Sequence, residues 1–177
     1  MAEERKLAID VVYVGVADPG DGVPGTSFTQ VSTVESGSIQ YNVNDPQKTE
    51  FKRYGSDKPW AVILKAGEAD TLVLNIPSPT MDERKLFMGG ELNGTKDEWK
   101  KPVVTPSIRK TLMLKTKPYG GKQLIYTFVN CDVFAKITQL PGEDTTEILQ
   151  VQFTVLGATT AAGVENTPMI VESKDAA

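Results

Sequence analysis

Residues 149–155 read Leu-Gln-Val-Gln-Phe-Thr-Val, in which apolar and polar side chains alternate with a period of two. Successive side chains of a β-strand point to opposite faces, so this period predicts a strand with one buried face and one wet face. The same alternation recurs along most of the chain. The apolar members of the predicted strands are Leu7, Ile9, Val11 and Tyr13; Ile39, Tyr41 and Val43; Leu72, Leu74 and Ile76; Ile108, Leu112 and Leu114; Leu124, Tyr126 and Phe128; and Leu149, Val151, Phe153 and Val155.

Turn-forming clusters of Gly, Pro, Asn and Asp separate these strands. They lie at residues 18–22, 44–46, 118–121 and 140–144. Regularly spaced strands with almost no helix favour an antiparallel β-sandwich or barrel. We therefore predict a mainly β protein that forms one domain over residues 1–177, with long loops. The polar ends, residues 1–5 and 172–177, are predicted to be flexible.

One short α-helix, at about residues 80–88, is predicted to flank the strands. Thr80 followed by Glu83 is a capping box, in which each side chain accepts a hydrogen bond from the other residue's backbone amide. The pair Gly89-Gly90 then supplies the left-handed residue that commonly ends a helix.

The two tryptophans have contrasting surroundings. Residues 60–64 are apolar at every position, which is typical of a strand covered on both faces. We predict that this strand is central and that Trp60 is part of the core. Trp99 lies among charged residues, so we predict that it is exposed at an interface, where tryptophan is enriched.

Two long stretches, residues 17–27 and 89–106, contain few strand signals. Loops of this length are usually functional or ordered by a partner. Asp18 and Asp21 lie in the first stretch and suggest calcium superficially, but the spacing and late glutamate of an EF-hand are missing. We predict a solvated turn in which both residues are candidates for an interface.

The predicted strand at residues 36–44 has one apolar face and one face that is polar but uncharged. Two interpretations remain: an ordinary outer strand, or a wall that lines an aqueous channel. The candidate channel-lining residues are Ser38, Gln40, Asn42 and Asn44.

Composition excludes most kinds of catalytic and binding site. The chain has no histidine and one cysteine, Cys131, so catalytic triads and zinc sites are not expected. The net charge is −4, and acidic and basic residues are interspersed along the chain, so there is no basic stripe that could bind nucleic acid. There is no phosphate-binding glycine motif and no apolar run of membrane-spanning length. We predict no enzyme, no cofactor, no metal and no small-molecule substrate; a carboxylate-based hydrolase would need two acids opposed across a cleft, which spacing does not reveal.

From about residue 60 onward, several features follow one another in a recognisable order. They are the strand at residues 71–77, the capped helix ending in Met88-Gly89-Gly90, the strand at 108–117, the run 124–130 leading into Val133-Phe134-Ala135, the strand at 148–156, and residues 167–171 after a linker of small residues. This order resembles the major tail protein, or tail tube protein, of long-tailed bacteriophages.

The resemblance implies a structural subunit of the virion tail, made in the host bacterial cytoplasm. Its copies would form hexameric rings with a β-lined lumen, and stacked rings would conduct DNA during ejection without binding it specifically. Its partners would be itself and other tail proteins, and no membrane. The family has no catalytic residues to carry over. A monomeric β-sandwich binding module, carbohydrate-binding or adhesin-like, is the alternative; it would display Trp99 or Tyr119 on a ligand face.

Overall fold

The computed structural model describes residues 8–175, so Leu7 and the predicted flexible residues 1–5 lie outside the described part. The protein is mainly β with one short helix and antiparallel strand pairing, a β-sandwich-like fold as predicted; the described strands do not close into a barrel. The elements are β1 (Val11–Ala17), β2 (Thr29–Gln30), β3 (Gln40–Asn42), β4 (Gln47–Lys52), β5 (Pro59–Lys65), β6 (Thr71–Pro77), α1 (Met81–Met88), β7 (Glu91–Leu92), β8 (Trp99–Lys100), β9 (Ile108–Thr116), β10 (Lys122–Gln139), β11 (Ile148–Val155), β12 (Ala158–Thr159), β13 (Glu165–Asn166) and β14 (Met169–Asp175).

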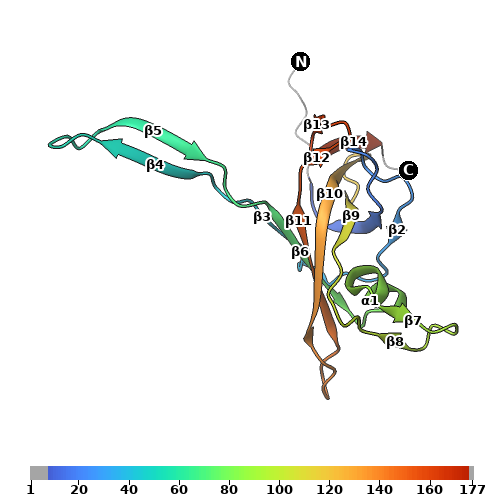
Figure 1. Ribbon diagram of the computed structural model, residues 1–177. Coiled ribbons are helices and arrows are strands. Elements are labelled where there is room, and N and C mark those ends of the chain that lie inside the picture. Colours follow the sequence, from blue (N-terminus) through green and yellow to red (C-terminus); the bar gives the residue numbers. More distant parts are fainter. Residues whose placement is uncertain (1–7, 176–177) are drawn as a thin grey trace.

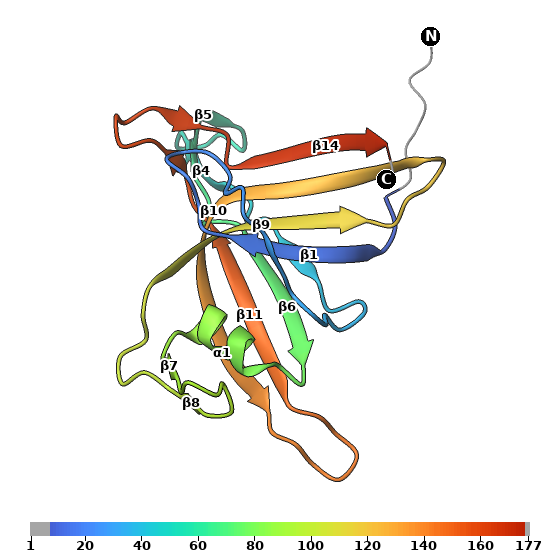
Figure 2. The ribbon, with the colours of Figure 1, turned by 90° about the vertical axis from the view of Figure 1, so that its right-hand side faces the viewer.

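One large sheet bends to form the two layers of the fold. Its strand order is β2-β1-β9-β10-β11-β6-β3, and β14 also pairs with β10. Residues 122–128 of β10 pair with β14 and residues 131–139 pair with β11, whereas β9 pairs with residues 125–133 in the middle of the strand. Figures 1 and 2 show that β1, β9 and β14 run in a clearly different direction from β6 and β11, so the long strand β10 belongs to both layers.

A β-bulge in β10 keeps its apolar side chains on the inner side of both layers. Phe128 lies opposite Leu112 and Cys131 lies opposite Lys110, so β10 carries one extra residue between these pairs. The apolar alternation of the sequence changes phase at this point, from Phe128 to Cys131 and Val133. All three side chains are buried because the extra residue absorbs the change of phase.

The core lies between the two layers and beneath α1. Phe87 of α1 and Phe153 of β11 meet edge to face, with ring centroids 6.2 Å apart. The predicted capping box of α1 is confirmed: the Glu83 amide donates to the Thr80 hydroxyl, and Glu83 Oε2 accepts from the Thr80 amide at 2.8 Å. The remaining core residues are Val14, Val16, Val31, Leu72, Leu74, Ile76, Met88, Leu112, Leu114, Phe128, Cys131, Val133, Ala135, Leu149 and Val151.

The C-terminal end that is predicted to be flexible lies in a strand as far as Asp175. Residues 169–175 form β14, which pairs with β10 from Met169 opposite Phe128 to Asp175 opposite Lys122. Most side chains of β14 are exposed, because it is an edge strand over a wet face. β14 therefore ends in charged residues and lacks the apolar alternation by which a strand is recognised in the sequence.

Thr111 fixes the bulge to the loop that covers it. Its side chain is fully buried, and its hydroxyl donates to the Val129 carbonyl at 2.6 Å and accepts from the Gly25 amide at 2.9 Å. Buried backbone groups need such partners, because leaving one unpaired costs about 1–3 kcal/mol. Thr111 thus satisfies two backbone groups that the sheet ladder does not.

We predict that Thr111→Val, which removes the hydroxyl at nearly constant volume, lowers the free energy of unfolding by about 1–3 kcal/mol. Urea denaturation measures this change. Thr154→Val, on the outer face of β11 where the threonine hydroxyl has no hydrogen bond among the described residues, is the control and should change stability by less than about 0.5 kcal/mol. Equal effects from the two variants would contradict the role of Thr111.

Candidate assembly interface

Strands β4 and β5 form a hairpin that projects far from the body of the protein (Figure 1). We call residues 47–65 the arm. Every residue of the arm is exposed except Ala61, which is half-buried. A two-stranded hairpin without further packing is at best marginally stable in water. The arm is therefore the part of the described fold that most needs a second surface.

The arm presents apolar side chains on both of its faces. Thr49 lies opposite Ile63 and Glu50 opposite Val62, so Ile63 faces one side while Val62 and Leu64 face the other. Ile63 is 51% exposed and Leu64 65% exposed. The prediction of two apolar faces is confirmed, whereas the prediction of a central strand is wrong, because no described element covers either face.

Trp60 is 63% exposed, so its predicted place in the core is also wrong. Its ring lies 6.4 Å from that of Phe51, and the Arg53 guanidinium lies 6.0 Å from its centroid. Tyr54 at the turn is completely exposed. Aromatic and arginine side chains together on an exposed surface are typical of interface hot spots.

The arm and the rest of the chain have opposite net charges. The chain has 19 basic and 23 acidic residues, of which the arm holds five and two. The arm is therefore +3 and the remainder −7. Opposite charges on two surfaces favour and steer association between them, so this distribution of charge suits a contact between the arm and the body of a second copy.

The root of the arm is held firmly to the sheet. The Tyr41 hydroxyl donates to Asp70 Oδ2 at 2.7 Å, and Asn44 Nδ2 donates to the Ala69 carbonyl at 3.0 Å. Burial, followed by the hydrogen bond and charge of Asp70, raises the pKa of Tyr41 to about 12. The segments that lead into and out of the arm pass close to each other at Gly67, where a Cβ would lie 2.7 Å from the Asn44 carbonyl oxygen. The direction of the arm is thus determined by the body.

The candidate channel-lining residues have two different environments. The Ser38 hydroxyl donates to the Glu35 carbonyl at 2.7 Å and accepts from the Asn75 amide at 3.1 Å, and the Asn44 side chain is bound at the root of the arm. Gln40 and Asn42 are exposed on β3. Two of the four residues therefore stabilise their own chain, and two face outward.

Gln40 and Asn42 belong to a larger polar face that sequence reasoning missed. Gln40 lies opposite Val73, which lies opposite Gln152, and Asn42 lies opposite Thr71. Gln152 was visible in the sequence as a polar member of the opening alternation, but the pairing that joins it to β3 was not. We call the outward residues of β3, β6 and β11 the polar face: Gln40, Asn42, Thr71, Val73, Asn75, Gln150, Gln152 and Thr154.

Asp18 and Asp21 are both bound within their own chain. Asp18 pairs with Lys110 at 2.6 Å, and Asp21 Oδ1 accepts from the Ala161 amide at 2.6 Å. The loop at residues 17–27 is therefore ordered by its own protein, and the carboxylates point to different partners. Among residues 8–175, no group of three or more histidine, cysteine or acidic side chains could hold a metal ion.

The prediction that Trp99 is exposed is wrong. Trp99 is half-buried against the core, and its indole nitrogen donates to the Gly89 carbonyl at 2.8 Å. The short hairpin of β7 and β8 folds it over the end of α1, while its charged neighbours remain in water. Trp99 is therefore a structural residue that closes the loop at 89–106.

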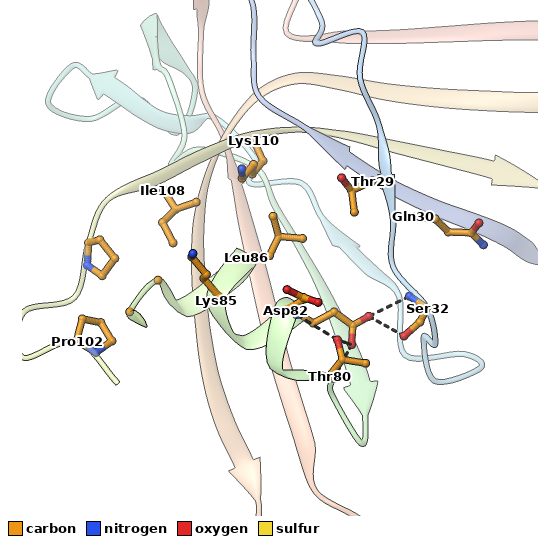
Figure 3. A pocket seen from close by; sticks show the side chains of 14 residues that line it. Thr29, Gln30, Ser32, Thr80, Asp82, Lys85, Leu86, Pro102, Ile108 and Lys110 are labelled. Carbon is orange, nitrogen blue, oxygen red and sulfur yellow. Dashed lines mark hydrogen bonds between the residues drawn. The ribbon is translucent and has the colours of Figure 1, made fainter. Parts of the chain in front are cut away.

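A groove of about 770 Å³ lies between α1, β2 and the segment at residues 102–108. Figure 3 shows Leu86, Pro102 and Ile108 around it. Glu83 also lines the groove and is bound to Ser32 and Thr80. Glu83 Oε1 accepts from the Ser32 amide at 2.9 Å and from the Ser32 hydroxyl at 2.7 Å. Burial alone would raise the pKa of Glu83, but the hydrogen bonds from Thr80 and Ser32 outweigh it and hold the pKa below its ordinary value.

No protein-family model matches the chain, and no curated protein matches its sequence significantly. Within residues 8–175, α1 spans eight residues, and no helix is long and apolar enough to cross a membrane. The function is therefore inferred from the arm, the polar face and the distribution of charge.

We predict that Glu83→Gln destabilises the protein by about 1–3 kcal/mol at pH 7, because an amide nitrogen cannot accept the backbone hydrogen bonds that a carboxylate oxygen accepts. A lowered carboxyl pKa stabilises the fold above the unfolded value and loses this effect as the pH falls through the folded value. The difference in the free energy of unfolding between wild type and Glu83→Gln should become smaller below pH 4.5, the ordinary pKa of a glutamate side chain. Urea denaturation across pH tests this; Glu165→Gln, on an exposed side chain, is the control, and a gap that does not depend on pH would contradict the prediction.

Proposed function

We propose that the protein is a structural subunit that assembles with copies of itself through its arm. One observation supports this more than any other: the arm has apolar side chains on both faces, and no described element of its own chain covers them. Natural proteins avoid exposing such strands unless a partner covers them, because bare edges and apolar faces aggregate. A second copy is the simplest partner that is always present.

The exposed arm offers enough apolar surface to hold copies together. Burying one large apolar side chain contributes roughly 1.5–3 kcal/mol. The arm has Phe51, Trp60, Val62, Ile63 and Leu64 at 41% to 65% exposure, so covering their exposed parts contributes roughly 4–8 kcal/mol, which offsets much of the cost of association, itself about 4–15 kcal/mol. In a ring each copy both gives and receives an arm, so the contacts reinforce one another.

The arm meets a different surface on its neighbour, so the contact is heterologous. Such contacts produce closed rings when the rotation between copies divides a full turn, and otherwise filaments. We propose rings, hexameric in the family that the sequence resembles, stacked into a tail tube in the virion that conducts DNA. The mainly β fold with one flanking helix supports this proposal.

The polar face suits the lumen of such a tube. Its outward side chains are almost all uncharged glutamine, asparagine and threonine. They hydrate well and carry no charge; the same outward face continues on β10 with Asp132 and Lys136, one acid and one base, so it offers phosphates no array of cations to bind. The net charge of −4 acts in the same direction. Exposed strand edges, such as that of β14, which among the described strands pairs only with β10, are available to join neighbouring copies.

The groove beside α1 favours a second candidate function, a monomeric binding module. Its volume of about 770 Å³ lies within the range of roughly 300–1,000 Å³ that is typical of small-ligand sites. The ligand would lie against Leu86 and Ile108, and not on Trp99. A protein that stays monomeric at every concentration and binds a glycan would favour this function.

We predict that the full chain forms rings or tubes and that a variant without the arm is monomeric. In this variant an Asn-Gly turn replaces residues 46–66, whose ends are close at Asn44 and Gly67. Light scattering after chromatography and negative-stain electron microscopy measure assembly, and circular dichroism verifies folding. Val62→Thr with Leu64→Thr should weaken assembly in the same direction. Val103→Thr with Val104→Thr, an exposed apolar pair outside the arm, is the matched control and should leave assembly unchanged.

We predict that assembly shields Trp60 from solvent. The chain has two tryptophans, so Trp99→Phe leaves Trp60 as the only one, and its fluorescence should be quenched strongly by acrylamide in dilute monomer and weakly in the assembled state. Trp60→Phe leaves the half-buried Trp99 as the matched control, with little change between states. Equal quenching of Trp60 in both states would mean that the arm stays uncovered.

A further inference from the structure

We propose that the basic end of the arm binds the acidic end of the β10–β11 hairpin on a second copy. The arm tip is residues 52–58, and the acidic tip is residues 140–144. The inference rests on the proposed function, because it names the surface that receives the arm. It is drawn from the charges on each tip that have no ion-pair partner among the described residues.

The arm tip holds three cations that have no carboxylate partner in the described structure: Lys52, Arg53 and Lys58. The one ion pair within the arm lies further back, between Lys48 and Glu50 at 3.1 Å. Asp57 is the only acid of the tip, so its net charge is +2. Tyr54 projects completely exposed among these cations. The tip is thus a cationic surface with an aromatic centre.

The acidic tip has the complementary composition. Glu143 and Asp144 lie at the turn, and no basic residue occurs between β10 and β11. Neither acid has an ion-pair partner among the described residues, and Leu140 beside them is 71% exposed. Each tip therefore combines charged side chains with an exposed apolar or aromatic one, and the charges of the two tips have opposite signs.

The acidic tip is presented on a rigid base. The third acid of this region, Glu147, accepts hydrogen bonds from the two terminal guanidinium nitrogens of Arg84 at 2.6 and 2.7 Å, and both side chains are mostly buried. The Ser78 amide also donates to the Glu147 carbonyl at 2.9 Å. This arrangement leaves Glu143 and Asp144 for an outside partner and lowers the cost of ordering the tip on binding.

The two tips point away from the body in different directions. Figures 1 and 2 agree that the arm and the β10–β11 hairpin project from separate parts of the molecule. A contact between the tips is therefore a contact between copies. Each copy has one tip of each kind, so the contact repeats from copy to copy, as heterologous assembly requires.

The charges select the register of the contact and contribute less to its strength. Exposed ion pairs stabilise a contact only weakly, whereas like charges brought together oppose it strongly. The apolar part of the arm supplies most of the affinity. Reversing the charge of one tip should therefore prevent docking, and supplying the opposite reversal should restore it.

Two charge-reversed full-length variants test the pairing. The first carries Arg53→Glu and Lys58→Glu, so that both of its tips are acidic. The second carries Glu143→Lys and Asp144→Lys, so that both are basic. We expect each variant alone to need at least about tenfold more protein for assembly than wild type, equivalent to about 1.4 kcal/mol. A 1:1 mixture should assemble within a few-fold of wild type, because each arm then meets a tip of opposite charge.

Glu91→Lys with Glu165→Lys reverses two exposed acids outside both tips and is the matched control, expected to assemble like wild type; thermal unfolding verifies that all variants fold. If wild type assembles and the two variants do so equally well, or their mixture is no better than either alone, the pairing is wrong and the proposed function stands. A wild type that never assembles overturns both. If the first variant assembles normally but loses binding to a short DNA duplex in a gel shift, the arm tip binds polyanions, and the pairing is again wrong.

Discussion

The strand β10 has to keep its apolar side chains on one side while it passes from one layer of the sheet to the other, and the rest of the fold depends on this. A single extra residue between Phe128 and Cys131 makes it possible. The bulge leaves backbone groups outside the ladder, and Thr111 binds one of them together with the loop at residues 17–27. Both layers then enclose one core, and Phe87 of α1 closes it.

This core is complete without the arm. The buried cluster contains no residue of β4 or β5, so the apolar side chains of the arm are surplus to the folding of the single chain. They expose surface that a stable protein ordinarily covers, and the clamp between Tyr41 and Asp70 holds them in a defined direction. The arm is a hairpin with apolar side chains on both faces, and its net charge is opposite to that of the body. Such a hairpin is suited to joining copies of one chain.

Local signals in the sequence predicted much of the fold. The capping box of Thr80 and Glu83 predicted the start of α1 to within one residue, because its hydrogen bonds join neighbours in sequence. The alternation predicted β6, β9, β11 and parts of β1, β3 and β10, but it missed β4 and β14. It also did not show which strands pair, so the polar face was only half visible at Gln40 and Asn42. The two tryptophans were misplaced for one reason: the pattern around Trp60 shows that both faces need cover, but not whether that cover comes from the same chain. The burial of Trp99 was not visible in the sequence, because its neighbours in the chain are charged and remain in water.

Hydrogen–deuterium exchange of the backbone amides of β4 and β5, compared between dilute and assembled protein, tests the central claim most directly. In the dilute state the arm lacks packing, so its amides should exchange rapidly while those of β10 and β11 remain protected. If a second copy covers the arm, the assembled protein should protect the amides of residues 47–65 strongly, with little change in the core. Arm amides that exchange equally fast in both states would contradict the account.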